Sequence, residues 1–284
     1  MALKDRPATK GQGSSHREAH KAARDNPDKL PKDQEVSHGN RDLISAIVVP
    51  AHSCSARLPN KPMLSATGTA LVVHTLESAL KCQYATDVGM VTDSLDTFRI
   101  VEGCLRGKIL PIFSHCKAAC GTERIASWMD KQEGWETYQV VMNLQCDEPC
   151  IDPRDLGNLM LAAHLTGEIS TLVAPLKTEE FRNPNSVKAY LRGDGIRQFS
   201  RSMIAGADPS TARLHIGAYA FPEPAFRCFR MQMHPSAKEV SLEQLTWLNN
   251  GYKIRAVQVK FTDNPLSVNT PQDYSRFCER MRAR

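Results

Sequence analysis

The 284-residue sequence lacks any apolar run long enough to cross a membrane. A spanning helix needs roughly 18 to 20 consecutive apolar residues, whereas the run at residues 43–49 is short and contains Ser45. Residues 1–40 also lack the apolar stretch of roughly 7 to 15 residues that a secretory signal requires. We therefore expect no membrane partner and a cytoplasmic location.

The pattern of a disulfide scaffold is missing as well. The nine cysteines are an odd number in a long chain without an export signal, which predicts reduced thiols. Cys116 and Cys120, beside His115, and the pair Cys146 and Cys150 leave a zinc site open as an alternative. We favour buried or incidental thiols, because structural zinc sites gather four ligands in one small module.

A strong charge of either sign is absent. The chain has 36 Lys and Arg against 31 Asp and Glu, a net charge of +5, with no basic block of the kind that binds nucleic acid. This mild excess suits a protein that handles phosphorylated or carboxylated small molecules as well as it suits weak nucleic-acid contact, so charge alone does not choose between them. Because no basic block is present, we favour a small-molecule partner over nucleic acid. Residues 1–40 are polar with few apolar groups, which predicts a disordered tail, and residues 41–284 are expected to form one domain.

Strand-like and helix-like stretches alternate along this domain. The expected strands are residues 44–50, 88–92, 109–113, 139–144, 169–173, 187–191 and 214–221. The expected helices are residues 70–80, 97–105, 122–129, 153–164, 241–248 and 271–281. The alternation predicts an α/β fold with a mostly parallel twisted sheet, helices on both faces, and ligands beyond the carboxyl ends of the strands.

The loop after the first expected strand carries two cations four positions apart, Arg57 and Lys61. A guanidinium fork and an ammonium, together with backbone N–H groups, are suited to a polyphosphate. The loop lacks the Lys-Ser/Thr ending of a P-loop, so a Walker-type ATPase is not supported. A solvated basic loop is the alternative.

Two carboxylates, Asp147 and Glu148, follow the strand that ends near Leu144. Carboxylates at this edge of a sheet are well placed to hold Mg²⁺ on phosphate oxygens. A turn with an acidic helix cap is the alternative. A helix start is indicated by Gly121-Thr122-Glu123-Arg124, with a threonine cap and an early acidic residue. By itself this segment indicates no function.

Taken in order, these segments and others resemble the CMP-Kdo synthetase (3-deoxy-manno-octulosonate cytidylyltransferase) family over residues 44–282. The matching segments are Pro50-Ala51, Arg57-Leu58-Pro59, Lys61-Pro62, Val73-His74, Thr92-Asp93, Gly121-Thr122-Glu123-Arg124, Asn143-Leu144-Gln145, Asp147-Glu148-Pro149, Asn183-Pro184-Asn185, Val187-Lys188, Phe199-Ser200-Arg201, His215-Ile216-Gly217, Tyr219, Leu242-Glu243-Gln244-Leu245, Thr270-Pro271 and Asp273. Arg-x-x-x-Lys-Pro alone would indicate only a sugar nucleotidyltransferase. The shared order and spacing carry the resemblance.

The resemblance implies a nucleotide-diphospho-sugar transferase-like fold and a homodimer that couples CTP to the acidic sugar Kdo, with Mg²⁺ as cofactor, for lipopolysaccharide synthesis. It assigns Arg57, Lys61 and Asp147 to both catalysis and nucleotide binding. It assigns Ser55 and Gln145 to nucleotide binding. The implied sugar-binding residues are Gln145, Arg201, His215, Tyr219, Glu243 and Gln244. The implied metal ligands are Asp147 and Asn269. His215 alone would more often be a core histidine.

The sequence departs from the family pattern at four positions. His52 replaces an arginine, Asn60 and Cys146 replace glycines, and Asn269 replaces an aspartate that ligates metal. An amide oxygen is a weaker ligand than a carboxylate for a hard cation. Three readings stay open: an active CMP-Kdo synthetase, a cytidylyltransferase for another acidic sugar or a phosphonate, and a nucleotide-binding relative without turnover.

Overall fold

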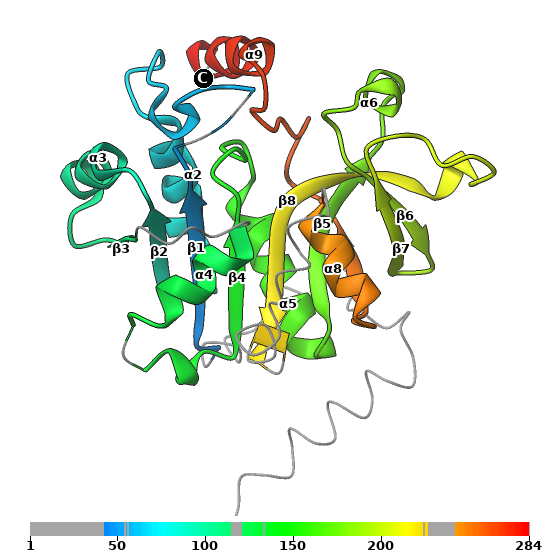
Figure 1. The fold of residues 1–284 in the computed structure, drawn as a ribbon, viewed down its shortest axis with the longest axis horizontal. Helices are drawn as coiled ribbons and strands as arrows, with labels where there is room; N and C mark the ends of the chain where they lie inside the picture. The colour runs from blue at the N-terminus through cyan, green and yellow to red at the C-terminus, as the bar shows by residue number, and fades with distance from the viewer. Residues whose placement is uncertain are drawn as a thin grey trace, which may run out of the picture. The chain divides into compact units, whose positions relative to one another are not determined.

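The computed structural model describes residues 43–53, 55, 57–114, 121–132, 134–223, 225–226 and 242–283. The chain divides into two units, Met1–Asn40 and Arg41–Arg284. The predicted tail at residues 1–40 lies outside the described residues, as do His115, Cys116 and Cys120 of the alternative zinc site. The second unit contains all the helices and strands of the described residues (Figure 1).

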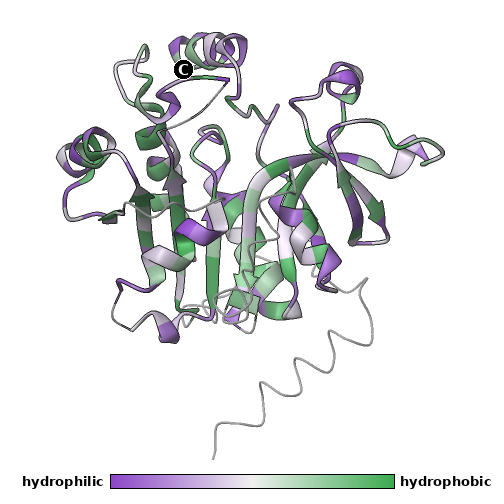
Figure 2. Cartoon of the chain, viewed as in Figure 1, coloured by the Kyte–Doolittle hydropathy of each residue, from purple (hydrophilic) through white to green (hydrophobic). Residues whose placement is uncertain are grey.

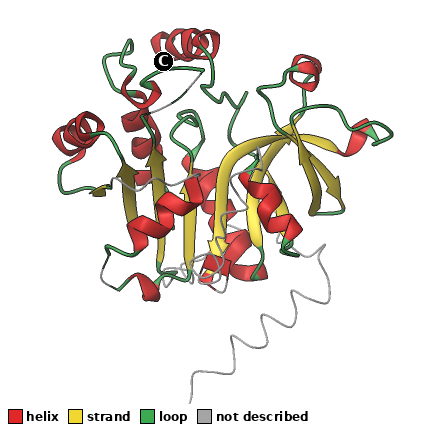
Figure 3. Ribbon diagram, viewed as in Figure 1, coloured by secondary structure: helices red, strands yellow, loops and turns green. Residues whose placement is uncertain are grey.

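Nine strands in the described part of the chain form one sheet of order β3-β2-β1-β4-β8-β5-β9-β7-β6. The strands are β1 (Ser45–Ala51), β2 (Asp87–Thr92), β3 (Leu110–Phe113), β4 (Val140–Leu144), β5 (Ile169–Pro175), β6 (Lys188–Arg192), β7 (Gly195–Ser200), β8 (Ala212–Pro222) and β9 (Ile254–Gln258). The helices and 3₁₀ turns are η2 (Lys61–Met63), α2 (Leu71–Leu80), α3 (Leu95–Leu105), α4 (Gly121–Met129), η3 (Trp135–Thr137), α5 (Pro153–Thr166), α6 (Thr178–Arg182), η4 (Pro209–Thr211), α8 (Glu243–Asn249) and α9 (Pro271–Arg282). Figure 3 shows the helices against the sheet.

The α/β prediction is confirmed, and the strand directions refine it. The four strands from β3 to β4 are parallel to one another. The long strand β8 then lies antiparallel between β4 and β5, and β6 and β7 also pair in antiparallel fashion. The sheet is therefore parallel in its first half and mixed in its second.

The alternation of side chains along β1 explains why helices cover both faces. Ile47 and Val49 belong to one core cluster with the apolar sides of α2, α3 and α5. Ala46 and Val48 belong to a second cluster with α4 and α8. Successive residues of a strand point to opposite faces, so a strand buried on both faces is a continuous apolar run. Figure 2 shows this concentration of hydrophobic residues in the central strands.

No helix in the described part of the chain is long and apolar enough to cross a membrane. The C-terminal helix α9 packs through Phe277 and Cys278 in a third apolar cluster with Leu58 and Leu71. This contact brings the segment before α9 to the loop after β1.

Candidate active site

Two cations of the loop after β1 contact residues that are distant in the sequence. Arg57 donates one hydrogen bond to Asn185 Oδ1 at 2.7 Å and another to Asn269 Oδ1 at 3.0 Å. Lys61 Nζ lies 2.5 Å from Asp147 Oδ2. Burial alone would lower the pKa of Lys61, but the Asp147 carboxylate outweighs burial and the pKa is raised. Lys61 is therefore cationic at neutral pH.

The turn before Lys61 requires a left-handed residue. Asn60 has φ 52° and ψ 29°. Glycine adopts this conformation freely, and asparagine is among the few other residues that visit it routinely. The departure from the family's glycine at this position is thus compatible with the backbone.

The two carboxylates after β4 have different environments. Asp147 Oδ1 is buried and has no hydrogen-bond partner among the described residues. Glu148 Oε1 accepts hydrogen bonds from Gly217 N at 2.9 Å and Ser267 Oγ at 2.6 Å. Burial, and then the charge of Asp147, raises the pKa of Glu148 to about 8. Asp147 therefore presents a buried carboxylate oxygen without a hydrogen-bond partner among the described residues.

These donors fit Mg²⁺. No cluster of three or more His, Cys, Asp or Glu side chains suited to a metal occurs among the residues that the structure describes. Mg²⁺ usually takes one or two carboxylates and completes its shell with water and substrate phosphates, and the unpartnered Asp147 Oδ1 is such a ligand. The second predicted ligand, Asn269 Oδ1, accepts a hydrogen bond from Arg57.

Of the residues predicted for the sugar, Gln145 directly follows β4, and the other five come from the mixed half of the sheet and from α8. Arg201 directly follows β7, His215 and Tyr219 lie on β8, and Glu243 and Gln244 begin α8. The Arg201 guanidinium lies 3.4 Å from Pro184 O and 3.3 Å from Asn185 O. Burial, and then the charge of Arg57, lowers the pKa of Arg201.

His215 is held in one tautomer. Its Nε2 lies 3.1 Å from Thr171 Oγ1, and the Thr171 hydroxyl donates to Ala218 O at 2.7 Å. Since that hydroxyl has a single proton, His215 Nε2 must be the donor, which leaves Nδ1 as an acceptor. Burial, and then Arg201, lowers the pKa of His215 to about 3. The ring is therefore neutral at pH 7.

Lys188 is a residue whose role the sequence analysis missed. Its side chain is buried, and Nζ donates to three backbone carbonyls, Asn183 O at 2.6 Å, Arg201 O at 2.8 Å and Ser186 O at 3.0 Å. The signal for this role in the sequence was a lysine inside an expected strand, in the matching segment Val187-Lys188. Lys188 joins the loop that carries Asn185 to the residue that carries the Arg201 guanidinium.

A cavity of about 720 Å³ unites these groups. The predicted residues that line it are Arg57, Gln145, Asp147, Arg201, His215, Tyr219, Glu243, Gln244 and Asn269. Lys61 contacts the cavity through Asp147, and Ser55 lies in the loop after β1 outside the lining. A volume of this size is typical of small-molecule sites.

The other two departures from the family pattern, His52 and Cys146, are not among the residues that line the cavity. His52 Nδ1 is 2.5 Å from Asp93 Oδ2, and the Arg124 guanidinium approaches both residues. Cys146 is buried in the first core cluster, and burial raises the pKa of its thiol to about 12. Cys146 is therefore a core thiol at neutral pH.

The chain is similar to known cytidylyltransferases. The family model described as cytidylyltransferase matches residues 46–254. The 3-deoxy-manno-octulosonate cytidylyltransferase of Chlorobium phaeobacteroides (strain BS1) is 37% identical over 240 residues, which cover 80% of this chain and 92% of that protein.

Two solved structures are similar in fold. The structure of CMP:2-keto-3-deoxy-manno-octonic acid synthetase complexed with CTP has a TM-score of 0.72 and 28% identity, covering 84% of this chain and 99% of that one. A putative glucose-1-phosphate thymidylyltransferase from Bacillus anthracis, at 14% identity, has a TM-score of 0.63 and covers 84% of this chain and 95% of its own. The nucleotide-diphospho-sugar transferase-like fold is thus confirmed, and the chain belongs to the cytidylyltransferase family.

Proposed function

We propose that this protein is a 3-deoxy-manno-octulosonate cytidylyltransferase, which transfers CMP from CTP to Kdo and releases pyrophosphate. The observation that carries the proposal is a single cavity whose lining includes Arg57 and Asp147, assigned to the nucleotide, together with Arg201 and His215, assigned to the sugar. The relatives named for this reaction support the choice of substrates.

The reaction joins the anomeric hydroxyl of the sugar to the α-phosphorus of CTP. Catalysis of such a displacement is mostly positioning and compensation of charge. Arg57 is hydrogen-bonded to two neutral amides and makes no ion pair among the described residues, so its charge is available to a triphosphate. Lys61, held by Asp147, is placed to bind the same group.

Mg²⁺, held by Asp147 and the amide oxygen of Asn269, would withdraw charge from the phosphate oxygens. Gln145 would lie between nucleotide and sugar. Arg201 is the cation for the Kdo carboxylate, and His215 Nδ1 offers an acceptor to a sugar hydroxyl. The neutral ring suits that role, because an imidazolium would repel Arg201.

The proposal extends to the setting of the reaction. By resemblance to the family we propose a cytoplasmic homodimer that supplies an activated sugar for lipopolysaccharide synthesis. Sedimentation of the purified protein tests the homodimer.

The test of the reaction is Asp147→Asn. We expect this variant to lose pyrophosphate release from CTP, Mg²⁺ and Kdo by about 10²-fold or more, because it removes the carboxylate ligand. Asp96→Asn is the control, since Asp96 is exposed on α3 and its side chain is 4.0 Å from Arg99.

Retention of more than about a tenth of wild-type turnover by Asp147→Asn would remove Asp147 from catalysis. Wild-type protein that releases pyrophosphate with another acidic acceptor and not with Kdo would correct the substrate. Binding of CTP without turnover on any acceptor would favour the reading of a relative without activity.

A further inference from the structure

Two segments, residues 147–155 and residues 260–268, lie side by side from the predicted metal ligand Asp147 to the start of α5. Val268 N donates to Asp147 O at 2.8 Å, and Ser267 Oγ donates to Glu148 Oε1. Further along, Asp152 N donates to Thr262 Oγ1 at 2.9 Å. Residues 260–268 therefore run antiparallel to residues 147–155.

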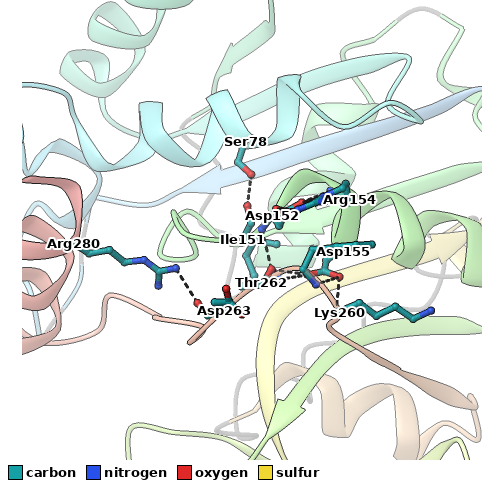
Figure 4. Close-up of polar contacts among 10 residues, drawn as sticks. Ser78, Ile151, Asp152, Arg154, Asp155, Lys260, Thr262, Asp263 and Arg280 are labelled. Carbon is teal, nitrogen blue, oxygen red and sulfur yellow. Dashed lines mark hydrogen bonds and ion pairs between the residues drawn. The ribbon is translucent and has the colours of Figure 1, made fainter. Parts of the chain in front are cut away.

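Asp155 closes the far end of this pairing (Figure 4). Its carboxylate accepts hydrogen bonds from the backbone N–H groups of Lys260 at 2.9 Å, Phe261 at 3.1 Å and Thr262 at 2.7 Å, and from the Thr262 hydroxyl at 2.7 Å. Asp155 is fully buried. A buried carboxylate that accepts this many hydrogen bonds fixes three consecutive residues of the opposing segment.

The Thr262 hydroxyl is both a hydrogen-bond donor and an acceptor. It donates to Asp155 Oδ2 and accepts from Asp152 N, so it ties the segment to two points of the turn into α5. That turn is itself fixed, because Ser78 Oγ of α2 lies 2.5 Å from Ile151 O (Figure 4).

A second anchor holds the middle of the segment. Arg280 of α9 donates to Asp263 O at 2.8 Å (Figure 4). It also donates to Asn264 O at 2.8 Å. Lys177 Nζ lies 2.5 Å from Asn264 Oδ1. Only residues 265–267 lie between Asn264 and Val268, which donates to Asp147 O. A shift of residues 260–264 would therefore be transmitted to Val268 through a short length of chain.

We propose that Asp155, together with Thr262, is a positioning residue for the side chains assigned to Mg²⁺ and the triphosphate. Asp155 sets the register of residues 260–268 against residues 147–155. That register places Ser267 against Glu148 and Asn269 against Arg57. The identity of the positioned ligands, Mg²⁺ and CTP, rests on the proposed function.

The test uses two isosteric changes, Asp155→Asn and Thr262→Val. An amide at residue 155 turns one acceptor oxygen into a donor that faces backbone N–H groups. Valine at residue 262 removes the hydroxyl that joins Asp155 to Asp152 N. Thr262→Ser keeps the hydroxyl and should restore wild-type behaviour.

Asp152→Asn is the matched control. The Asp152 carboxylate caps the same helix, three residues away, but its hydrogen bonds are with Arg154 and not with the backbone of residues 260–262. Among the described residues, it reaches that segment only through the Arg154 guanidinium, which lies 4.0 Å from the centroid of the Phe261 ring. A variant that merely weakens α5 would behave like this control.

The first readout is hydrogen exchange in the protein without ligand. We expect faster exchange of the amides of residues 263, 264 and 266–270 in Asp155→Asn and Thr262→Val, and wild-type exchange there in Asp152→Asn. The second is kinetic: KM for CTP and the Mg²⁺ concentration for half-maximal rate should each rise by roughly tenfold, because small displacements of positioning groups are costly. KM for Kdo should stay within about twofold, because all the residues predicted for the sugar except Gln145 lie on β8, α8 and the end of β7, outside the two paired segments.

Unchanged exchange at residues 263–270 in both variants would overturn the proposal. Faster exchange with unchanged Mg²⁺ and CTP dependence would overturn it too, because the register would then not reach the site. If the wild-type protein does not turn over CTP with Kdo, the proposed function fails, whereas exchange and calorimetry with Mg²⁺ and CTP still decide the role of Asp155.

Discussion

Asn269 is the predicted metal ligand that carries no charge. The family pattern has an aspartate here, and the structure places Asn269 Oδ1 3.0 Å from the Arg57 guanidinium, on the wall of the cavity. Its backbone N–H donates to Asp273 Oδ2 at 3.1 Å, which fixes the backbone position from which the side chain extends. The position therefore suits a metal ligand, but with a neutral donor.

We predict that Asn269→Asp lowers the Mg²⁺ concentration required for half-maximal rate, because a carboxylate binds a hard divalent cation more strongly than an amide does. A Mg²⁺ titration of pyrophosphate release measures this. Asn249→Asp adds the same charge at an exposed position at the end of α8 and serves as the control. If turnover and Mg²⁺ requirement are the same in Asn269→Asp and wild type, Asn269 is not a metal ligand.

Single residues differ in how much of their role the sequence reveals. Lys61 and Asp147 were predicted from their position after strands, and the structure joins them in one ion pair. Lys188 and Asp155 were not predicted, because a buried charge is recognisable only from its partners. Those partners are backbone groups of distant segments, which no residue pattern specifies.

At the scale of elements, β8 is the strand that shapes the cavity. Its pairing with β5 shifts register between Thr171, which is opposite Tyr219, and Leu172, which is opposite Ile216. The extra residues, Gly217 and Ala218, form a bulge, a feature that often redirects side chains near active sites. Gly217 N also donates to Glu148, so the bulge is tied to the loop after β4.

We predict that Gly217→Ala lowers turnover by tenfold or more, on the order of what small misplacements of catalytic groups cost. An added Cβ would lie 2.8 Å from Gln145 Oε1 and 3.1 Å from Glu148 Oε1, so both side chains must move. Steady-state kinetics and a urea unfolding curve measure the effect. Gly103→Ala is the control, because nothing lies within 4 Å of a Cβ on this α3 residue. Equal turnover in the two variants would contradict the role of the bulge.

The strands that the sequence did not predict are β7 and β9, and the short helix α6 was also not predicted. Gly195–Ser200 contains Arg197 and Gln198, and Ile254–Gln258 contains Arg255, so neither forms a continuous apolar run. Strand positions follow from local alternation, whereas strand neighbours depend on long-range packing. The insertion of β8 between β4 and β5, which makes half of the sheet mixed, is of this second kind.

At the scale of the whole molecule, stability should depend on the protonation of buried groups. His215 has its pKa lowered to about 3 from an ordinary value of 6.5. Between these values the unfolded chain binds a proton that the folded protein excludes, so stability falls as the pH drops below about 6.5. Glu148, whose pKa is raised to about 8 from 4.5, acts in the opposite direction, and its folded state loses stability as the pH rises through that range.

The contribution of His215 can be isolated with His215→Gln, which has no titratable group at this position. We predict that the free energy of unfolding falls more steeply from pH 7 to pH 5 in the wild type than in this variant, by up to about 1.4 kcal/mol per pH unit below the ordinary histidine pKa. Urea unfolding at pH 7, 6 and 5 measures the two slopes. His164→Gln, on the half-buried part of α5, controls for the loss of a histidine. Parallel slopes in wild type and His215→Gln would show that the folded protein takes up a proton at His215 as readily as the unfolded chain does.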